Sequence, residues 1–503
     1  MSGSSSYRTI LRSSSIIGGA QVINIAVSLV KMKVVAVVLG PAGVGLIGLY
    51  LSLVETASSI AAMGLGYVGT RQIAAAHAEG GDEAVGRTRR ALFWGTMALA
   101  LIGAAVFWLA SGWIARVILA DESRISDVAW LSLGVALTVA AGSQGALLTG
   151  LRRIGDLARI KVGAGAIGAV FGVLALWLWG ANGLIAMVLI APIVNFLLGH
   201  VYVARLGPPA GMRIRLPEMS REWWAMVTLG FAFLLSFLIT MLGQLAARTL
   251  VQRELGAEAL GQFQAAWAIG MTYLGFVLGA MGTDYYPRLT ATIRDPAAAT
   301  RLVNEQTEVA LLLCAPVLLA MLGLAPWVIR LLYSAEFSPA VEILRWQLLG
   351  DVLKVVSWPL GYVIVAAGAG KTFVATESLG MGVFVLGVLI GLPLIGVAAT
   401  GVAFLALYVA YLPLVWMLGG RRIGFRWTRS VKLQALAVMA AAVAVDVAAR
   451  WSELLGAAIG VALAATMGGW ALMRLSAMAE LAGVLGGVVR LGERMKGWMI
   501  KPR

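Results

Sequence analysis

Runs of about twenty apolar residues recur along the 503-residue chain, and they constrain its fold more than any other feature. Each run is about long enough to cross a hydrocarbon layer of roughly 30 Å. Backbone polar groups in lipid must find partners within the protein, so a spanning run has to be a helix. The mean hydropathy of +0.90 and the 13% of charged residues agree with this reading, since soluble domains average about 25%. The sequence therefore predicts an all-α integral membrane protein.

Fourteen spans can be delimited, and most joints between them are short. Turn formers such as Gly40 and Pro41, or clustered arginines, occupy the joints. The polar N-terminal stretch shows no signal-peptide pattern, so we expect the first run to remain as the first span. The predicted spans cover residues 14–39, 43–69, 91–119, 126–150, 159–180, 183–204, 223–252, 258–284, 303–331, 339–367, 372–393, 396–419, 432–449 and 454–473.

Basic residues are distributed unevenly between the two sides of these spans. With the N-terminus in the cytoplasm, 29 of the 39 Lys and Arg residues fall inside, 5 fall outside and 5 lie within spans. Cytoplasmic loops of membrane proteins carry such an excess, so we expect both termini in the cytoplasm. The net charge of +15 then forms a cytoplasmic rim that meets anionic lipid. This distribution argues against nucleic acid as a partner.

A short motif occurs twice, as LGPAGVG at 39–45 and as LGAEALG at 255–261. Six spans separate the copies, so both face the same way across the membrane, as in transporters built from two parallel repeats. The motif predicts two pseudo-symmetric six-helix lobes. The predicted parts are the N-lobe at 1–204, a cytoplasmic loop at 205–222, the C-lobe at 223–419, two further spans at 432–473 and a basic cytoplasmic tail at 474–503.

The tenth span carries charges near its middle. A charge inside a span costs about 2.5–3.5 kcal/mol on insertion scales, so it normally faces a polar cavity. Five residues spaced by four, three, four and four share one helical face, namely Gln347, Asp351, Lys354, Trp358 and Tyr362. The pattern predicts a cavity wall. The alternative is that Asp351 and Lys354 neutralise each other inside the bundle.

Cationic residues also occur in the first and seventh spans. Asn24 and Lys31 share a face of the first span, whereas Lys33 points nearly the opposite way. The sequence leaves open which of the two lysines faces a cavity. Arg248 shares a face with Gln244 in the seventh span. The alternative for Arg248 is an interfacial arginine whose charged head reaches the membrane surface.

The second span places Glu55 near its middle, either as a proton or cation site or as a counter-ion to a first-span lysine. Trp267 lies deep in the eighth span and, like Trp358 and Tyr362, either stacks on sugar rings or packs in the protein. The midspan charges comprise four cations and two acids. A cavity with this surplus predicts a polyanionic ligand such as a diphosphate. It argues against a cation-coupled drug antiporter, for which we would expect an acidic cavity.

Features of an enzyme are missing from the sequence. His77, His200 and Cys314 are too remote from one another in sequence to predict a metal site. The stretch AAGAGKT at 366–372 lacks the first glycine of a phosphate-binding loop, because position 365 is Val. A polymerase or ligase of polysaccharide assembly would carry a large outside loop, and the longest here is only about ten residues. We therefore expect no enzyme activity and no cofactor.

Three stretches resemble the Wzx-type flippases, the O-antigen and enterobacterial common antigen (lipid III) translocases. They are VVLGPAGVGLIGLY, YYPRLTA and EFSPAVEILRWQLLGDVLKVVSWPLGYVIVA. The resemblance covers roughly residues 10–420 and implies a V-shaped, two-lobed bundle of the MATE-like superfamily in the bacterial inner membrane. It implies transport of undecaprenyl-diphosphate-linked oligosaccharide from the cytoplasmic to the periplasmic leaflet by alternating access. Other polysaccharide-assembly membrane proteins are further partners that it implies.

The resemblance also implies roles for individual residues. The lysine and acid of the G-D-V-L-K run fall on Lys354 and Asp351, the first-span lysine on Lys33 and the seventh-span arginine on Arg248. Related peptidoglycan-precursor flippases carry cationic residues nearer the depth of Lys31. The Wzx pattern has twelve spans, whereas this sequence predicts fourteen, as in those peptidoglycan flippases, where the extra pair looks like a groove for the lipid tail.

Overall fold

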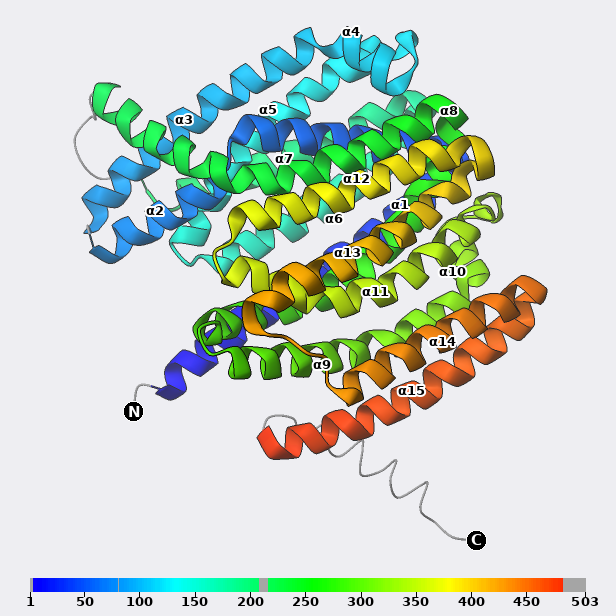
Figure 1. Ribbon diagram of the computed structural model, residues 1–503. Helices are drawn as coiled ribbons and strands as arrows, with labels where there is room; N and C mark the ends of the chain where they lie inside the picture. The colour runs from blue at the N-terminus through cyan, green and yellow to red at the C-terminus, as the bar shows by residue number, and fades with distance from the viewer. Residues whose placement is uncertain (1–2, 80, 208–215, 483–503) are drawn as a thin grey trace. The chain divides into compact units, whose positions relative to one another are not determined.

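The computed structural model describes residues 3–79, 81–207 and 216–482, and all regular structure in these ranges is helical (Figure 1). This confirms the predicted all-α class. The α helices are α1 (Gly3–Ala62), α2 (Leu65–Glu79), α3 (Gly81–Leu109), α4 (Ser111–Ile114), α5 (Ile125–Gly150), α6 (Ile154–Trp179), α7 (Gly183–Ala204), α8 (Leu216–Thr292), α9 (Pro296–Gly323), α10 (Ala325–Leu332), α11 (Ala340–Ala366), α12 (Gly370–Ile395), α13 (Ala399–Ile423), α14 (Arg429–Trp451) and α15 (Glu453–Ala482). Short turns of 3-10 or π helix lie at Ala115–Leu119, Glu122–Arg124, Gly180–Asn182, Ala335–Phe337 and Gly396–Ala398.

Ten helical runs within the described residues are long and apolar enough to cross a membrane. Four of these runs each contain two predicted spans, so together the ten account for the fourteen spans and for a multi-pass membrane protein. The predicted edges differ in places from the observed helix ends. The second predicted span, 43–69, passes a break at Met63 and Gly64, where both residues have positive φ. The third, 91–119, is one helix only as far as Leu109.

The two copies of the repeated motif have the same backbone conformation. Gly40 interrupts α1 with φ 62° and ψ −163°, and Gly256 interrupts α8 with φ 82° and ψ −177°. Glycine occupies such a conformation without the steric cost that a Cβ would bring. Each long helix is therefore two spans joined at a glycine, as the motif predicts.

The sequence separation between Gly40 and Gly256, called the repeat offset below, also relates elements far beyond the motif. Helix α12 begins and ends at Gly370 and Ile395, which lie at the repeat offset from Ile154 and Trp179, the two ends of α6. The glycines that follow these helices, Gly180 and Gly396, both have positive φ. Helices α7 and α13 begin at the same offset. The recurrence confirms the predicted pseudo-symmetry, and it relates residues of one half to counterparts in the other.

Two compact units make up the chain, residues 1–261 with 332–334 and residues 262–331 with 335–503. The division by packing falls later than the predicted boundary between lobes, and the predicted lobe bounds remain a prediction. Most of the predicted loop at 205–222 and the part of the predicted tail beyond residue 482 lie outside the described residues.

Inside the first unit, the two copies of the motif touch each other. A Cβ built on Gly45 would lie 2.4 Å from the carbonyl oxygen of Ala257, and one built on Gly261 would lie 1.9 Å from that of Pro41. Real Cβ contacts stay above 3.0 Å. Glycine at both positions therefore lets α1 and α8 approach backbone to backbone, which small residues permit between membrane helices.

In the second unit, the two C-terminal helices α14 and α15 lie beside α9 (Figure 1). Asn304 of α9 is 5% exposed and donates from its side-chain nitrogen to the carbonyl oxygen of Arg426, at 3.1 Å. Its side-chain oxygen accepts from the backbone N–H of Thr428, at 2.9 Å. Thr428 in turn caps α14 by accepting from the N–H of Val431. Predicted spans thirteen and fourteen are thus anchored to α9.

Candidate functional site

Helix α11 carries the five residues predicted to share a face, and its middle holds an unusual buried polar pair. Gln347 is 0% exposed and Asp351 is 1% exposed. Within the described residues, neither the Gln347 amide nor the Asp351 carboxylate has a hydrogen-bond partner for any of its side-chain atoms. Burying such groups without partners costs free energy, and native structures rarely retain them without a reason.

The pair faces α8. A Cβ built on Gly270 would lie 3.6 Å from both the Asp351 Oδ2 and the Gln347 Oε1 atoms. The glycine therefore leaves the two side chains against bare helix backbone. A larger residue at this position would crowd the carboxylate and the amide.

Lys354, one turn further along α11, is held by soft and aromatic groups. Its Nζ atom lies 3.6 Å from the sulfur of Met271 and 5.6 and 5.8 Å from the ring centroids of Phe404 and Tyr408. These ring distances are in the range of cation–π attraction. Within the described residues no direct ion pair joins Lys354 to Asp351. Lys354 and Asp351 are nevertheless close enough to act on each other electrostatically, so the choice between a cavity wall and mutual neutralisation stays a prediction.

The internal repeat acts as a control for this polar pair. At the repeat offset, Asp351 corresponds to Val135 and Gln347 to Leu131. Both of these apolar residues are 0% exposed in the first unit. The same helical arrangement therefore packs without polar groups at these positions. Polar side chains at these two positions are therefore not needed for the packing of this kind of helix, and their role in a site remains a prediction.

The repeat also relates charged residues of one unit to uncharged residues of the other. Lys354 corresponds to Thr138, and its neighbour Met271 corresponds to Glu55. Glu55 and Thr138 also lie together, because both line a pocket of about 190 Å³ in the first unit. The first unit thus has an acid, and the second a lysine, at equivalent contacts between two helices.

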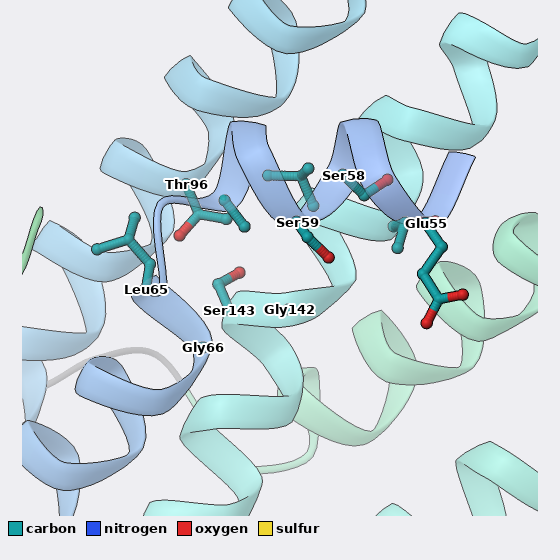
Figure 2. A pocket seen from close by; sticks show the side chains of 11 residues that line it. Glu55, Ser58, Ser59, Leu65, Gly66, Thr96, Gly142 and Ser143 are labelled. Carbon is teal, nitrogen blue, oxygen red and sulfur yellow. The ribbon is translucent and has the colours of Figure 1, made fainter. Parts of the chain in front are cut away.

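Hydroxyl groups dominate the polar lining of the Glu55 pocket. In Figure 2 the hydroxyls of Ser59, Thr96 and Ser143 lie around one gap. The Glu55 carboxylate extends at the far end of the labelled group from Thr96. Within the described residues, Ser58 Oγ and Thr96 Oγ1 have no hydrogen-bond partner. Sequence reasoning missed these hydroxyl residues, and the correspondence of Thr138 with Lys354 is the signal that points to them.

Arg248 of α8 lies inside the first unit. It is 7% exposed, and the Glu55 carboxylate is close enough to act on it electrostatically. The structure thus associates two of the predicted charged residues. The buried position of Arg248 also differs from the alternative prediction, in which the guanidinium group of an interfacial arginine would extend from the protein.

The first-span residues have different neighbours. Lys33 donates a hydrogen bond to the backbone carbonyl of Tyr333, and Lys31 is half-buried. Asn24 is half-buried against α6, where a Cβ on Gly165 would lie 2.6 Å from its Oδ1 atom. Gln244, four residues before the predicted arginine, is half-buried as well. The assignment of these residues to a ligand site remains a prediction.

The predicted aromatic residues separate into two environments in the second unit. Trp267 is 7% exposed, with ring centroids of Phe263, Phe384 and Phe404 at 5.4, 5.6 and 5.7 Å. Of the two readings for Trp267, stacking on sugar or packing in the protein, this arrangement favours packing.

Trp358 and Tyr362 remain half-buried and lie edge to face, with ring centroids 4.9 Å apart. Tyr285 lies 5.7 Å from each of these rings. The Tyr285 hydroxyl donates to the carbonyl oxygen of Pro359 at 2.9 Å. This bond connects α8 to α11 and holds the aromatic group in place. Trp358 and Tyr362 keep partly exposed ring surface on which a sugar could stack.

In the part of the chain that the structure describes, no three His, Cys, Asp or Glu side chains gather closely enough to hold a metal ion.

Comparisons with known proteins agree with this fold. A family model described as "Polysaccharide biosynthesis protein" matches residues 10–292. The chain is 24% identical over 424 residues to the lipid III flippase of Escherichia coli (strain K12), covering 80% of this chain and 96% of that protein. The lipid III flippase of Shigella flexneri matches equally.

Solved structures share the architecture. An inward-facing multidrug resistance MATE family transporter of the MOP superfamily has a TM-score of 0.65 and 14% identity, and it covers 82% of this chain and 99% of its own. Lipid II flippase MurJ in an inward closed conformation has a TM-score of 0.65 and 11% identity, and it covers 92% and 99%. At such identities these matches establish the fold alone.

Proposed function

The chain belongs to the polysaccharide biosynthesis protein family, and from this premise we propose that it is a flippase for lipid-linked oligosaccharide. The observation that carries the proposal is the likeness to the lipid III flippases, which extends along 80% of the chain. The proposed activity moves a molecule between leaflets and changes no chemical bond, in line with the expectation that the chain is no enzyme.

The proposed substrate is an undecaprenyl-diphosphate-linked repeat unit of O-antigen or enterobacterial-common-antigen type. Its diphosphate is the group that cationic side chains recognise, since Lys and Arg form charge-assisted hydrogen bonds with phosphate oxygens. Lys354 suits this role because sulfur and aromatic rings hold it and no carboxylate among the described residues forms a direct ion pair with its nitrogen. Arg248 and either Lys31 or Lys33 supply the remaining positive charge.

Asp351 and Gln347 are proposed as the site of a coupling ion, either a proton or sodium. Their unpartnered oxygens, and the apolar counterparts Val135 and Leu131, support this role. A cation bound there would satisfy the buried carboxylate, and its release would leave an unpaired charge whose cost favours a different conformation. Glu55, beside its hydroxyl-lined pocket, is a second candidate for the same task.

Transport then proceeds by alternating access in the bacterial inner membrane, with both termini in the cytoplasm. The diphosphate enters from the cytoplasmic leaflet and exchanges water for lysine and arginine donors. The sugars pass along the aromatic pair Trp358 and Tyr362, while the polyprenyl tail stays in lipid. The membrane potential, worth about 2.3 kcal/mol per charge per 100 mV, is a further candidate for the energy source. Other membrane proteins of polysaccharide assembly are candidate partners.

Complementation tests the proposal directly. A bacterial strain that lacks its own flippase is supplied with this chain, and surface glycan is scored. Wild type should restore the glycan, whereas Lys354→Ala and Arg248→Ala should abolish the rescue at normal protein levels. Lys371→Ala, at an exposed position in the first turn of α12, serves as a control that should leave rescue intact. Full rescue by both variants would refute the assignment of the site, and failure of wild type across lipid-linked glycans would refute the function.

A further inference from the structure

A second polar pocket lies in the second unit, where α10 ends and α11 begins. It has a volume of about 240 Å³, and its polar lining includes Arg330, Ser338, Glu342, Arg345 and Glu453. A single water needs only about 10–15 Å³ of such space. The pocket is therefore large enough for a small polar group, and two arginines and two glutamates line it.

Arg345 is the group in this pocket with the strongest need for a ligand. Its Nε and Nη2 atoms are buried, and within the described residues neither has a hydrogen-bond partner. Arginine stays charged in proteins, so these N–H groups require an acceptor. The repeat again provides a control, because the counterpart at the repeat offset is Ala129. The fold therefore tolerates a small residue at this position.

Each of the two glutamates has a long ion-pair contact with an arginine among the described residues. Arg330 lies 3.9 Å from Glu453, and Arg450 lies 3.8 Å from Glu342, with all four side chains more than a third exposed. Exposed pairs at such distances contribute little free energy. Their carboxylates can therefore accept hydrogen bonds from a cationic group that enters the pocket.

Helix α11 begins beside the pocket at Ala340, and Pro339 and Val341 line the wall there. Pro339 carries no backbone N–H, and the N–H of Val341 donates to the carbonyl oxygen of Ser338 at 3.1 Å. The side chain of Arg345 is therefore the donor that an anionic oxygen in the pocket would meet.

Exposed apolar residues adjoin two of the lining residues in the sequence. Leu331 follows Arg330 and is 74% exposed, and Leu454 follows Glu453 and is also 74% exposed. Trp451, at the end of α14, is 88% exposed. Tryptophan at the ends of membrane helices is typical of the lipid headgroup level. A ligand here meets polar groups in the pocket and an apolar surface beside it.

We propose that this pocket binds a membrane phospholipid whose headgroup carries a phosphate and a primary amine, that is, phosphoethanolamine. The phosphate binds Arg345, and the ammonium donates to Glu342 and Glu453. A purely anionic headgroup would leave the two carboxylates facing it, and a quaternary amine could not donate hydrogen bonds to them. Glu453 belongs to α15, so the site gives the C-terminal helix pair a role in lipid binding, separate from the proposed cargo site.

The test uses the full-length protein in delipidated detergent micelles. Native mass spectrometry measures binding of phosphatidylethanolamine, phosphatidylcholine and phosphatidylglycerol with identical acyl chains. Wild type should bind phosphatidylethanolamine about tenfold more tightly than the other two, which corresponds to about 1.4 kcal/mol. Equal binding of all three lipids would overturn the proposal.

Substitutions separate the two halves of the headgroup. Arg345→Ala should weaken phosphatidylethanolamine binding about tenfold, because the phosphate loses its partner. Glu342→Gln with Glu453→Gln should abolish the preference over phosphatidylcholine and leave phosphatidylglycerol binding at or above its wild-type level. Arg288→Ala, at an exposed pair elsewhere in the second unit, is the control and should change nothing.

Folding is checked through the melting temperature without added lipid. The counterpart Ala129 leads us to expect that Arg345→Ala folds, with a melting temperature at or above that of wild type. If it folds and still binds phosphatidylethanolamine as tightly as wild type does, the site is refuted. Should it fail to fold, the glutamate double variant decides the matter, since an unchanged lipid preference there also refutes the proposal.

Discussion

The glycine contact between α1 and α8 yields the sharpest prediction about stability. In Gly261→Ala, the new Cβ would lie 1.9 Å from the Pro41 carbonyl oxygen and 2.5 Å from its carbonyl carbon. Real Cβ contacts stay above 3.0 Å, so the two helices must separate by about an ångström or deform. The clash is with backbone atoms of Pro41, so no change of side-chain rotamer can relieve it. The strain therefore falls on the first unit itself.

The expected magnitude follows from two opposing terms. Overpacking a tight contact costs about 1–3 kcal/mol, and a backbone clash belongs at the upper end of this range. The higher helix propensity of alanine relative to glycine stabilises a helix by about 0.5–1 kcal/mol. We therefore expect Gly261→Ala to lower the free energy of unfolding of the protein by about 2 kcal/mol. Gly45→Ala, with a Cβ 2.4 Å from the Ala257 carbonyl oxygen, should act in the same direction.

The assay is thermal unfolding of the purified protein in detergent, followed by circular dichroism or intrinsic fluorescence. Gly275→Ala and Gly279→Ala are matched controls in the same helix, because a Cβ at either position meets nothing within 4 Å. Both controls should keep or slightly raise the melting temperature, since they gain helix propensity without strain. If the melting temperature of Gly261→Ala equals that of the two control variants, the close approach of the two motif copies is refuted.

Two further predictions concern polar groups at helix ends. Asn304→Ala removes both hydrogen bonds between α9 and the segment entering α14, and it should lower the free energy of unfolding by about 2–3 kcal/mol, measured by thermal melting against Asn304→Asp. Hydrogen bonds from Ser123, with Arg124 nearby, lower the pKa of Asp121 in the loop before α5. Its charge therefore stabilises the protein above the ordinary pKa of about 3.9, and the contribution is lost as pH falls through the lowered value. Asp121→Asn should melt earlier than wild type at pH 7, and this difference should vanish in acid.

Hydropathy and one short motif were enough to predict the architecture. Apolar runs identify the spans because lipid permits little but helices. The motif around Gly40 and Gly256 identified the repeat because glycine at a helix joint adopts a conformation closed to other residues. Helix ends were less predictable. The break at Met63 and Gly64 follows a run that stays apolar, and hydropathy does not register it.

The site was harder to predict, because its character depends on the partners that each side chain meets. Sequence spacing predicts that Gln347 and Asp351 share one face of a helix. It does not show that their side chains lack a hydrogen-bond partner among the described residues. The same spacing made Asp351 and Lys354 a plausible ion pair, whereas Met271 and two aromatic rings hold the lysine. Contacts of this kind come from other helices, and no local pattern in the sequence contains them.

The internal repeat allows the role of the polar pair Gln347 and Asp351 to be tested by substitution. Gln347→Leu combined with Asp351→Val gives α11 the residues that its counterpart α5 carries as Leu131 and Val135, both 0% exposed. Replacing both members of a buried polar pair by apolar residues of similar shape can be nearly neutral or stabilising. We expect the double variant to melt at or above the wild-type temperature.

The same variant should fail to restore surface glycan in the complementation assay, because no group remains in this pair to bind a coupling ion. A polar pair that serves only packing would give the reverse result, with reduced stability and retained transport in the protein that still folds. Loss of both properties would show that α11 cannot accept the packing of α5, and the repeat would then no longer serve as a guide to function. Gain of stability with loss of transport is the one combination that identifies Asp351 and Gln347 as residues kept for function at the expense of the fold.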